Sequence, residues 1–230
     1  MIKVLPILLA VLYGLAMYRF SVWRTSRELD AKSTELADPI LKVLMERMAK
    51  ALDIARIKVH IYEIEPVNGL AAPDGRIFIT RGFFNKYRAG EVSSEEMATV
   101  IAHELGHVAL GHSRRRMIDF SGQNAMRTAL AMILGRFIPF VGPWIAGALT
   151  SLLAAGLSRK DEFEADAYAS ALLMKAGIGT APQKSLFTKL ETLTGARGAA
   201  TPAWMMSHPK TQQRIAAIEA NEAKWRSVTN

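Results

Sequence analysis

The sequence predicts a mainly α-helical domain of the α+β class, with a small β-sheet ahead of its central helix. Its 230 residues make one ordinary domain with room for an appendage, so an array of domains is excluded. Half of the residues are hydrophobic, which excludes a disordered chain. Long segments with apolar residues three and four positions apart dominate, and only short segments alternate in the manner of strands.

Charge and cysteine content exclude further classes. The chain has no cysteine, so a disulfide scaffold, a thiolate zinc site and a thiol nucleophile are excluded. The net charge of +8 suits an anionic membrane surface or a nucleic acid. The basic residues are scattered and lack interleaved aromatic side chains, so we expect no nucleic-acid partner.

Residues 1–24 predict a transmembrane anchor. The uncharged run that begins at Val4 continues, with one arginine, to Trp23, and about 20 residues are needed to cross the hydrocarbon core. A cleaved signal peptide is the alternative, but no small-residue cleavage site follows. The basic flank lies on the C-terminal side, so the positive-inside rule favours a cytoplasmic body and leaves a periplasmic one open. We expect a bacterial-type inner-membrane protein with the lipid bilayer as a partner.

Residues 25–230 form the body of the protein. Asp38 begins an amphipathic helix that runs to about Leu52. Lys58–Ile64 alternates as a strand, and Arg76–Thr80 is a second short strand after a turn region rich in glycine and proline.

The central helix begins at a capping-box pattern, Ser93 with Glu96, and is predicted to continue to about Met117. Later helices are expected over three ranges: 160–176, 182–194 and 210–225.

A second apolar stretch occupies residues 128–157. It is too short for two membrane spans with a turn, which need roughly 40 residues. We expect a helical hairpin, broken near Pro139 and Pro143, that dips into the membrane interface or covers the active site. A hairpin buried in the core, without lipid contact, is the alternative.

The central helix carries His103-Glu104-Leu105-Gly106-His107. Histidines four residues apart share one helical face, so both imidazoles can bind one metal ion. Glu104 projects beside the metal, where it can accept a proton from water. His112 lies five residues beyond His107, or 140° around a continuing helix, and is expected to point away from the ligands.

A catalytic zinc site needs a third protein ligand, which must here be His, Asp or Glu. The segment 158–166 offers Glu162, Glu164 and Asp166. Glu162 and Asp166 share a helical face, so one can bind metal while the other holds an imidazole. Spacing alone does not decide whether Glu162 or Glu164 is the third metal ligand.

Four motifs in order resemble the HtpX-like zinc peptidase family, which includes the CAAX prenyl endopeptidases and bacterial membrane-quality-control proteases. They span about residues 35–220: Asn68 to Gly82, His103 to His107, Ser158 to Asp166, and Ser207-His208-Pro209 with Arg214-Ile215. The resemblance implies a zincin-type metallopeptidase domain with one Zn²⁺ per chain. This chain has one N-terminal hydrophobic segment where the HtpX pattern has two.

The resemblance also implies residue roles. Glu162 is the third zinc ligand and Asp166 supports a ligand from behind. The strand Arg76-Ile77-Phe78-Ile79-Thr80 is an edge strand along which an extended protein or peptide substrate pairs. His208 lies near the metal, where it either stabilises the oxyanion or blocks the open position.

The resulting hypothesis is a membrane-anchored zinc endopeptidase, with Glu104 as general base, that acts in membrane or envelope protein quality control. The alternative is a non-hydrolytic chaperone or assembly factor with a closed structural zinc site.

Overall fold

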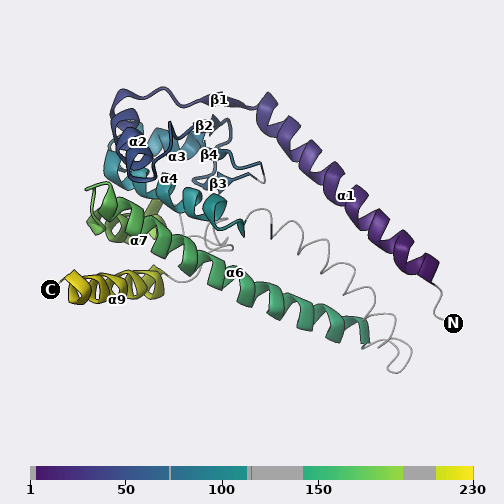
Figure 1. Cartoon of the computed structure of the whole chain (residues 1–230). Coiled ribbons are helices and arrows are strands. Elements are labelled where there is room, and N and C mark those ends of the chain that lie inside the picture. Colours follow the sequence, from purple (N-terminus) through teal and green to yellow (C-terminus); the bar gives the residue numbers. More distant parts are fainter. Residues whose placement is uncertain (1–3, 73, 113–114, 116–141, 194–210, 230) are drawn as a thin grey trace.

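The computed structural model describes residues 4–72, 74–112, 115, 142–193 and 211–229. Seven helices and a four-stranded mixed sheet lie within these ranges, which confirms the mainly helical α+β class (Figure 1). The helices are α1 (Val4–Ala31), α2 (Pro39–Ala51), α3 (Arg81–Arg88), α4 (Ser94–Ala109), α6 (Gly142–Lys175), α7 (Ala181–Leu193) and α9 (Thr211–Thr229). The strands are β1 (Ser33–Glu35), β2 (Val59–Tyr62), β3 (Gly69–Ala71) and β4 (Ile77–Thr80).

Two helix starts follow from their capping residues, as predicted. The Asp38 carboxylate accepts hydrogen bonds from the backbone N–H groups of Ile40 and Leu41, both at 3.0 Å, and so caps α2. At α4, Ser93 and Glu96 accept each other's backbone N–H in a complete capping box. Both caps satisfy donors that the first helical turn leaves unpaired.

The sheet has the order β1-β2-β4-β3. β4 pairs in parallel with β2 and antiparallel with β3, so both of its sides are hydrogen-bonded. The prediction that Arg76–Thr80 is an edge strand is therefore wrong: this strand is central, and the outer strand that contacts α4 is β3. β3 lies in the segment that the sequence predicts to be a turn.

The central helix ends earlier than predicted. α4 stops at Ala109, and Gly111 has a positive φ of 70°. Glycine adopts this left-handed conformation without the steric cost that other residues incur, and it commonly ends a helix. α4 therefore stops before the predicted boundary: His112 and Arg115 are helical again beyond the glycine, and Met117 lies outside the described residues.

α6 begins earlier than predicted, at Gly142, and continues through the segment expected to start a separate helix near residue 160. The predicted hairpin over 128–157 is thus divided. Residues 128–141 lie outside the described residues, and 142–157 belong to the helix that carries Glu162. α6 ends where predicted, before Gly177 and Gly179, which both have positive φ.

α4 lies at the centre of the hydrophobic core, with α2, α6 and α7 packed around it. Gly106 allows α6 to come close, because a Cβ atom at this position would lie 3.0 Å from both Cα and the carbonyl oxygen of Ala165. The two helices therefore meet backbone to backbone at Gly106, directly beside the histidines.

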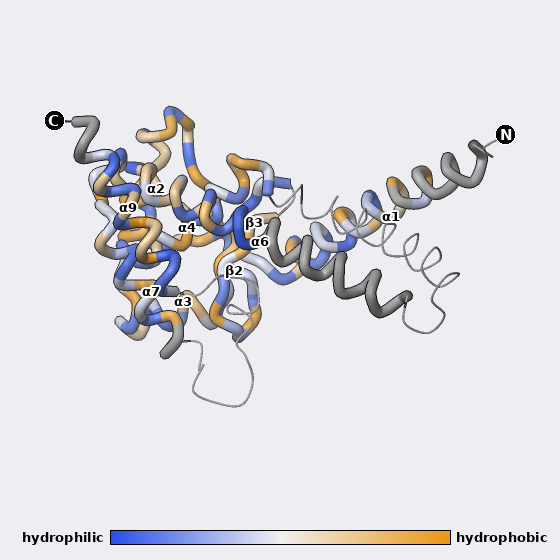
Figure 2. Tube along the Cα trace, turned by 90° about the horizontal axis from the view of Figure 1, so that it is seen from below, coloured by the Kyte–Doolittle hydropathy of each residue, from blue (hydrophilic) through white to orange (hydrophobic). Residues whose placement is uncertain are grey.

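α1 and the first half of α6 project from the body toward the same side (Figure 1). Figure 2 also shows the coloured part of α1 extending away from the body. Large apolar side chains of α1 remain exposed, including Leu12, Leu15, Phe20 and Trp23. Among the described residues, no helix meets the length and hydropathy needed to span a bilayer.

We expect Gly106→Val to destabilise the metal-free protein by about 1–3 kcal/mol, since the new side chain overpacks the contact with Ala165. Chemical denaturation measures the change. Ala109→Val, at an exposed position on the same helix, is the matched control. Equal stability of the two variants would contradict the close contact of α4 and α6.

Candidate metal centre

His103 and His107 lie side by side on one face of α4. Their Nε2 atoms are 3.1 Å apart, and the two rings meet edge to face. Only 2% and 4% of their surfaces are exposed. Two imidazole nitrogens therefore converge in a space from which water is largely excluded.

Glu162 brings a carboxylate from α6 to the same point. One of its oxygens lies 3.3 Å from Nε2 of His103, and the other lies 3.4 Å from Nε2 of His107. The side chain is fully buried. Of the two acids that spacing left open, Glu162 lies with the histidines, whereas Glu164 contacts His112.

The three donors fit a zinc ion. Ligand atoms bound at 2.0–2.2 Å around a tetrahedral ion are about 3.3–3.6 Å apart. The two imidazole Nε2 atoms are 3.1 Å apart, and each lies 3.3 or 3.4 Å from a different oxygen of the Glu162 carboxylate, which is close to these separations. Two histidines and one glutamate form a recurring set in catalytic zinc sites, which keep a fourth position for water or substrate.

Asp166 supports His103 from behind. Its Oδ1 lies 2.9 Å from Nδ1 of His103. Arg214 from α9 donates to both oxygens of the same carboxylate, at 2.6 Å each. Burial raises the pKa of Asp166, but the guanidinium outweighs this effect, so the pKa lies below its ordinary value. The carboxylate therefore stays charged.

The pKa of His103 is raised to about 9. Burial opposes the charged imidazole, but the hydrogen bonds with the carboxylates of Asp166 and Glu162 outweigh it. The site therefore attracts a positive charge, which is supplied by a proton or by a metal ion.

Arg214 belongs to the last of the four motifs, but its place in that motif did not indicate a role. It is 1% exposed, and its guanidinium lies over the ring of Phe187 at 4.0 Å. Ile218, one turn later on α9, is equally buried. The sequence signal that could have identified it is an arginine on the same helical face as buried apolar residues. A guanidinium buried in this way needs a buried acid as its partner.

The Glu104 side chain lies against strand β3. It is 3% exposed, and a Cβ atom at Gly69 would lie 2.9 Å from its Oε1 and 2.8 Å from Cγ1 of Val100. Only glycine allows β3 to pass this close to α4. The acid expected as general base thus lies against the outer strand of the sheet.

His112 corrects an expectation. The sequence predicts that it points away from the ligands, but it is fully buried and its Nδ1 lies 3.0 Å from Nδ1 of His107. The expectation assumed a helix that continues past residue 111. Because Gly111 interrupts the helix with a positive φ, the 140° rotation no longer applies, and His112 lies beside His107.

The other predicted site residues lie elsewhere. The strand residues Ile77 to Thr80 are buried inside the sheet, and Arg76 pairs with Asp74. His208 lies outside the described residues. Among these residues, then, the structure gathers His103, Glu104, His107, Glu162 and Asp166 at one place.

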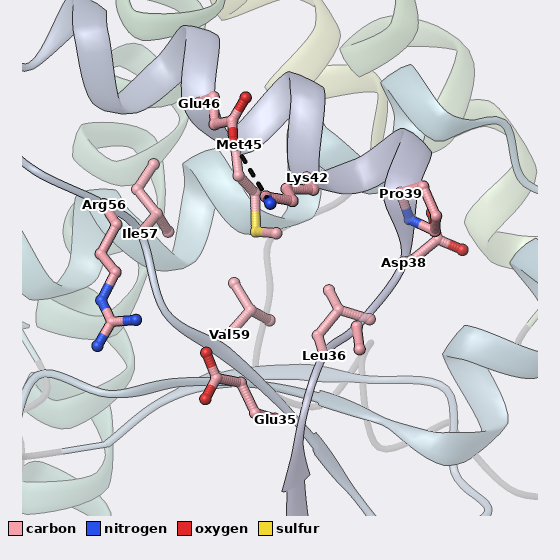
Figure 3. A pocket seen from close by; sticks show the side chains of 11 residues that line it. Glu35, Leu36, Asp38, Pro39, Lys42, Met45, Glu46, Arg56, Ile57 and Val59 are labelled. Atoms are coloured by element: carbon pink, nitrogen blue, oxygen red, sulfur yellow. Dashed lines mark ion pairs between the residues drawn. The ribbon is translucent and has the colours of Figure 1, made fainter.

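A cavity of about 710 Å³ lies apart from the triad, between α2 and the β1–β2 side of the sheet (Figure 3). Acidic and basic side chains both line it, and Lys42 and Glu46 form an ion pair there at 3.9 Å. None of the predicted site residues is among those that line the cavity. It therefore has no part in the chemistry of the triad.

Comparison with known proteins shows which family the chain resembles. The sequence model of Peptidase family M48 matches residues 35–222. The chain is 30% identical to Metalloprotease LoiP of Escherichia coli over 162 residues, which cover 70% of this chain and 61% of LoiP.

Two further relatives match over more of the chain. Metalloprotease YcaL of Escherichia coli is 26% identical over 84% of this chain and 73% of its own length. Protease HtpX of Stenotrophomonas maltophilia is 25% identical over 79% of this chain and 72% of its own length.

We expect metal binding near pH 7 to release about one proton from His103, because a pKa of about 9 leaves the metal-free imidazole protonated. The release should fall as the pH rises through 9. Calorimetric titration with zinc in buffers of different ionisation enthalpy measures it. In Asp166→Asn, which lacks the main anionic partner, the release at pH 7 should be smaller. A proton release independent of pH would contradict the raised pKa.

Proposed function

This chain belongs to Peptidase family M48 and is by family a metalloendopeptidase, and we propose that it hydrolyses peptide bonds with one zinc ion held by His103, His107 and Glu162. The observation that carries the proposal is the convergence of three buried side chains: the two Nε2 atoms are 3.1 Å apart, and each lies 3.3 or 3.4 Å from an oxygen of the Glu162 carboxylate. The proteins named metalloproteases among its relatives support the same activity.

Glu104 is the proposed general base. Zinc, when bound, acidifies a water molecule and polarises the scissile carbonyl. Glu104 follows the first ligand in the chain and is not a member of the ligand triad, so we assign its carboxylate to proton transfer and not to metal binding. It takes the proton of the attacking water and delivers it to the leaving amine.

Asp166 and Arg214 hold His103 in its binding orientation. With Nδ1 donating to Asp166, the Nε2 lone pair faces the metal. Arg214 fixes the carboxylate by two short hydrogen bonds and keeps it ionised. α9, which lies far along the chain from α4, thereby contributes to the metal centre.

An extended protein or peptide substrate is proposed to pair along β3. This strand is outermost in the described sheet and passes Glu104 at Gly69. Backbone pairing accepts many sequences and holds a substrate straight, which suits cleavage of unfolded chains. β3 thus takes the role that the sequence assigns to Arg76–Thr80.

His208 is kept as the proposed oxyanion donor. If it bound the metal permanently as a fourth ligand, the site would be closed and the protein would be a non-hydrolytic chaperone or assembly factor.

Residues 1–24 are proposed to anchor the enzyme in the bacterial inner membrane, where it acts in membrane or envelope quality control. Support comes from the exposed apolar side chains of α1. Arginines follow the apolar run at positions 24 and 27, so a cytoplasmic catalytic domain is favoured.

We expect Glu104→Gln to lower the rate of peptide cleavage by at least about 10²–10⁴-fold, because glutamine cannot accept the proton. The variant should still bind one zinc ion. Casein cleavage, with metal analysis of the same sample, measures both properties. Glu95→Gln, at an exposed position on α4, is the control. Near wild-type cleavage by Glu104→Gln would remove this residue from the mechanism.

We expect the full-length protein to stay in the membrane pellet after a carbonate wash. Leu12→Arg combined with Leu15→Arg should release it, since each arginine costs about 2.5–3.5 kcal/mol at the centre of a membrane helix. Met174→Arg, an exposed apolar position at the far end of α6, is the control and should remain in the pellet. Unchanged pelleting of the double variant would contradict the anchor.

A further inference from the structure

His112 lies behind the second histidine of the triad, on the side away from the metal position. Its Nδ1 is 3.0 Å from Nδ1 of His107, and its Nε2 is 3.1 Å from Oε2 of Glu164. Asp161 lies slightly farther from the same Nε2, at 3.8 Å. The side chain is fully buried, so these groups, rather than water, determine where its protons lie.

The positions of the protons follow from the proposed metal ligation. When His107 binds metal through Nε2, its Nδ1 carries a proton and donates. Nδ1 of His112 must then be the acceptor, which leaves the proton of the neutral His112 ring on Nε2. That Nε2 faces Glu164 and donates to its carboxylate. One continuous chain of donors and acceptors thus runs from Glu164 to the metal ligand.

The helix break after α4 holds this arrangement. Gly111, with a φ of 70°, returns His112 to His107, and Arg115 donates to the carbonyl oxygen of Leu110 and to Asp161. These contacts join the end of α4 to α6. They lie on the opposite side of the triad from the Asp166–Arg214 pair.

A second metal ion is the competing use of this cluster, because His112, Asp161 and Glu164 have ligand atoms within 4.8 Å of one another. A metal on Nε2 of His112 would place a proton on its Nδ1. The rings of His107 and His112 would then direct two N–H donors at each other across 3.0 Å. The second site is therefore incompatible with a neutral His107 bound to the first metal.

We propose that His112 is a positioning residue. It accepts a hydrogen bond from His107, the second metal ligand, and donates one to Glu164, so the negative charge of Glu164 acts on His107 through the ring of His112. This inference rests on the proposed zinc centre and deepens it. Each histidine ligand then has its own carboxylate-backed partner: Asp166 acts directly on His103, and Glu164 acts on His107 through His112.

The test compares the zinc affinity of the full-length protein and its variants by competition with a chelator. His112→Leu removes the acceptor and should weaken zinc binding about 10–100-fold. His112→Asn places an amide oxygen near the position of Nδ1 and should recover most of the loss. His60→Asn, in strand β2 and stacked on Phe78, is the histidine control and should match the wild type.

A spectroscopic readout and a mutant cycle separate positioning from folding. The visible absorption spectrum of the Co²⁺-substituted protein should change in His112→Leu and return in His112→Asn. The Glu164 side chain is 39% exposed, so Glu164→Ala leaves the fold intact. Glu164→Ala should weaken zinc binding in the wild type and have no further effect in His112→Leu.

Three outcomes overturn the inference: equal affinity of His112→Leu and wild type, no recovery in His112→Asn, or a second zinc ion per chain that Glu164→Ala removes. A wild-type protein that binds no zinc overturns both this inference and the proposed function. A protein that shows the expected dependence on His112 but cleaves no peptide overturns the proposed activity alone.

Discussion

The metal centre depends on how closely two helices approach. His103 and His107 stand on either side of Gly106 along α4, and Ala165 contacts α4 at that glycine. Glu162 lies three residues before Ala165 on α6, so the contact sets both the distance and the register at which its carboxylate reaches the imidazoles. Larger side chains at the crossing would separate the helices and the donors together. The glycine within the motif therefore allows the two helices to come close, whereas the histidines around it provide the metal-binding nitrogens.

Electrostatics then determines which charge the metal centre can bind. Glu104, Glu162 and Asp166 are each at most 3% exposed, and burying carboxylates without positive partners is strongly unfavourable. Arg214 supplies one permanent positive charge, held against Asp166. A further positive charge comes from the protonated His103, whose pKa is raised to about 9, or from the metal that displaces this proton. The same excess of buried negative charge therefore disfavours folding without a positive partner and favours metal binding.

Local signals in the sequence predicted much of this structure. The caps at Asp38 and Ser93 mark two helix starts, and Gly177 marks a helix end, because each acts within a few residues of itself. β1 and β3, of three residues each, depend on pairing with distant strands and carry no periodic pattern of their own. The position of His112 was predicted wrongly for a related reason: one glycine in a left-handed conformation interrupts the helix from which that position was calculated. The residue pattern does not determine the contacts between segments that are distant in the chain.

The continuity of α6 connects the proposed membrane anchor to the metal. Glu162 lies 20 residues beyond Gly142 in one unbroken helix, which corresponds to about 30 Å along its axis. α1 and the first turns of α6 project to the same side of the body, so a bilayer that held α1, as proposed, would also meet the start of α6 (Figure 1). About 30 Å is the thickness of the hydrocarbon core, so Glu162 would remain outside the lipid even with those turns immersed. Under this proposal both ligand helices would lie on one face of the membrane, as a shared ion requires.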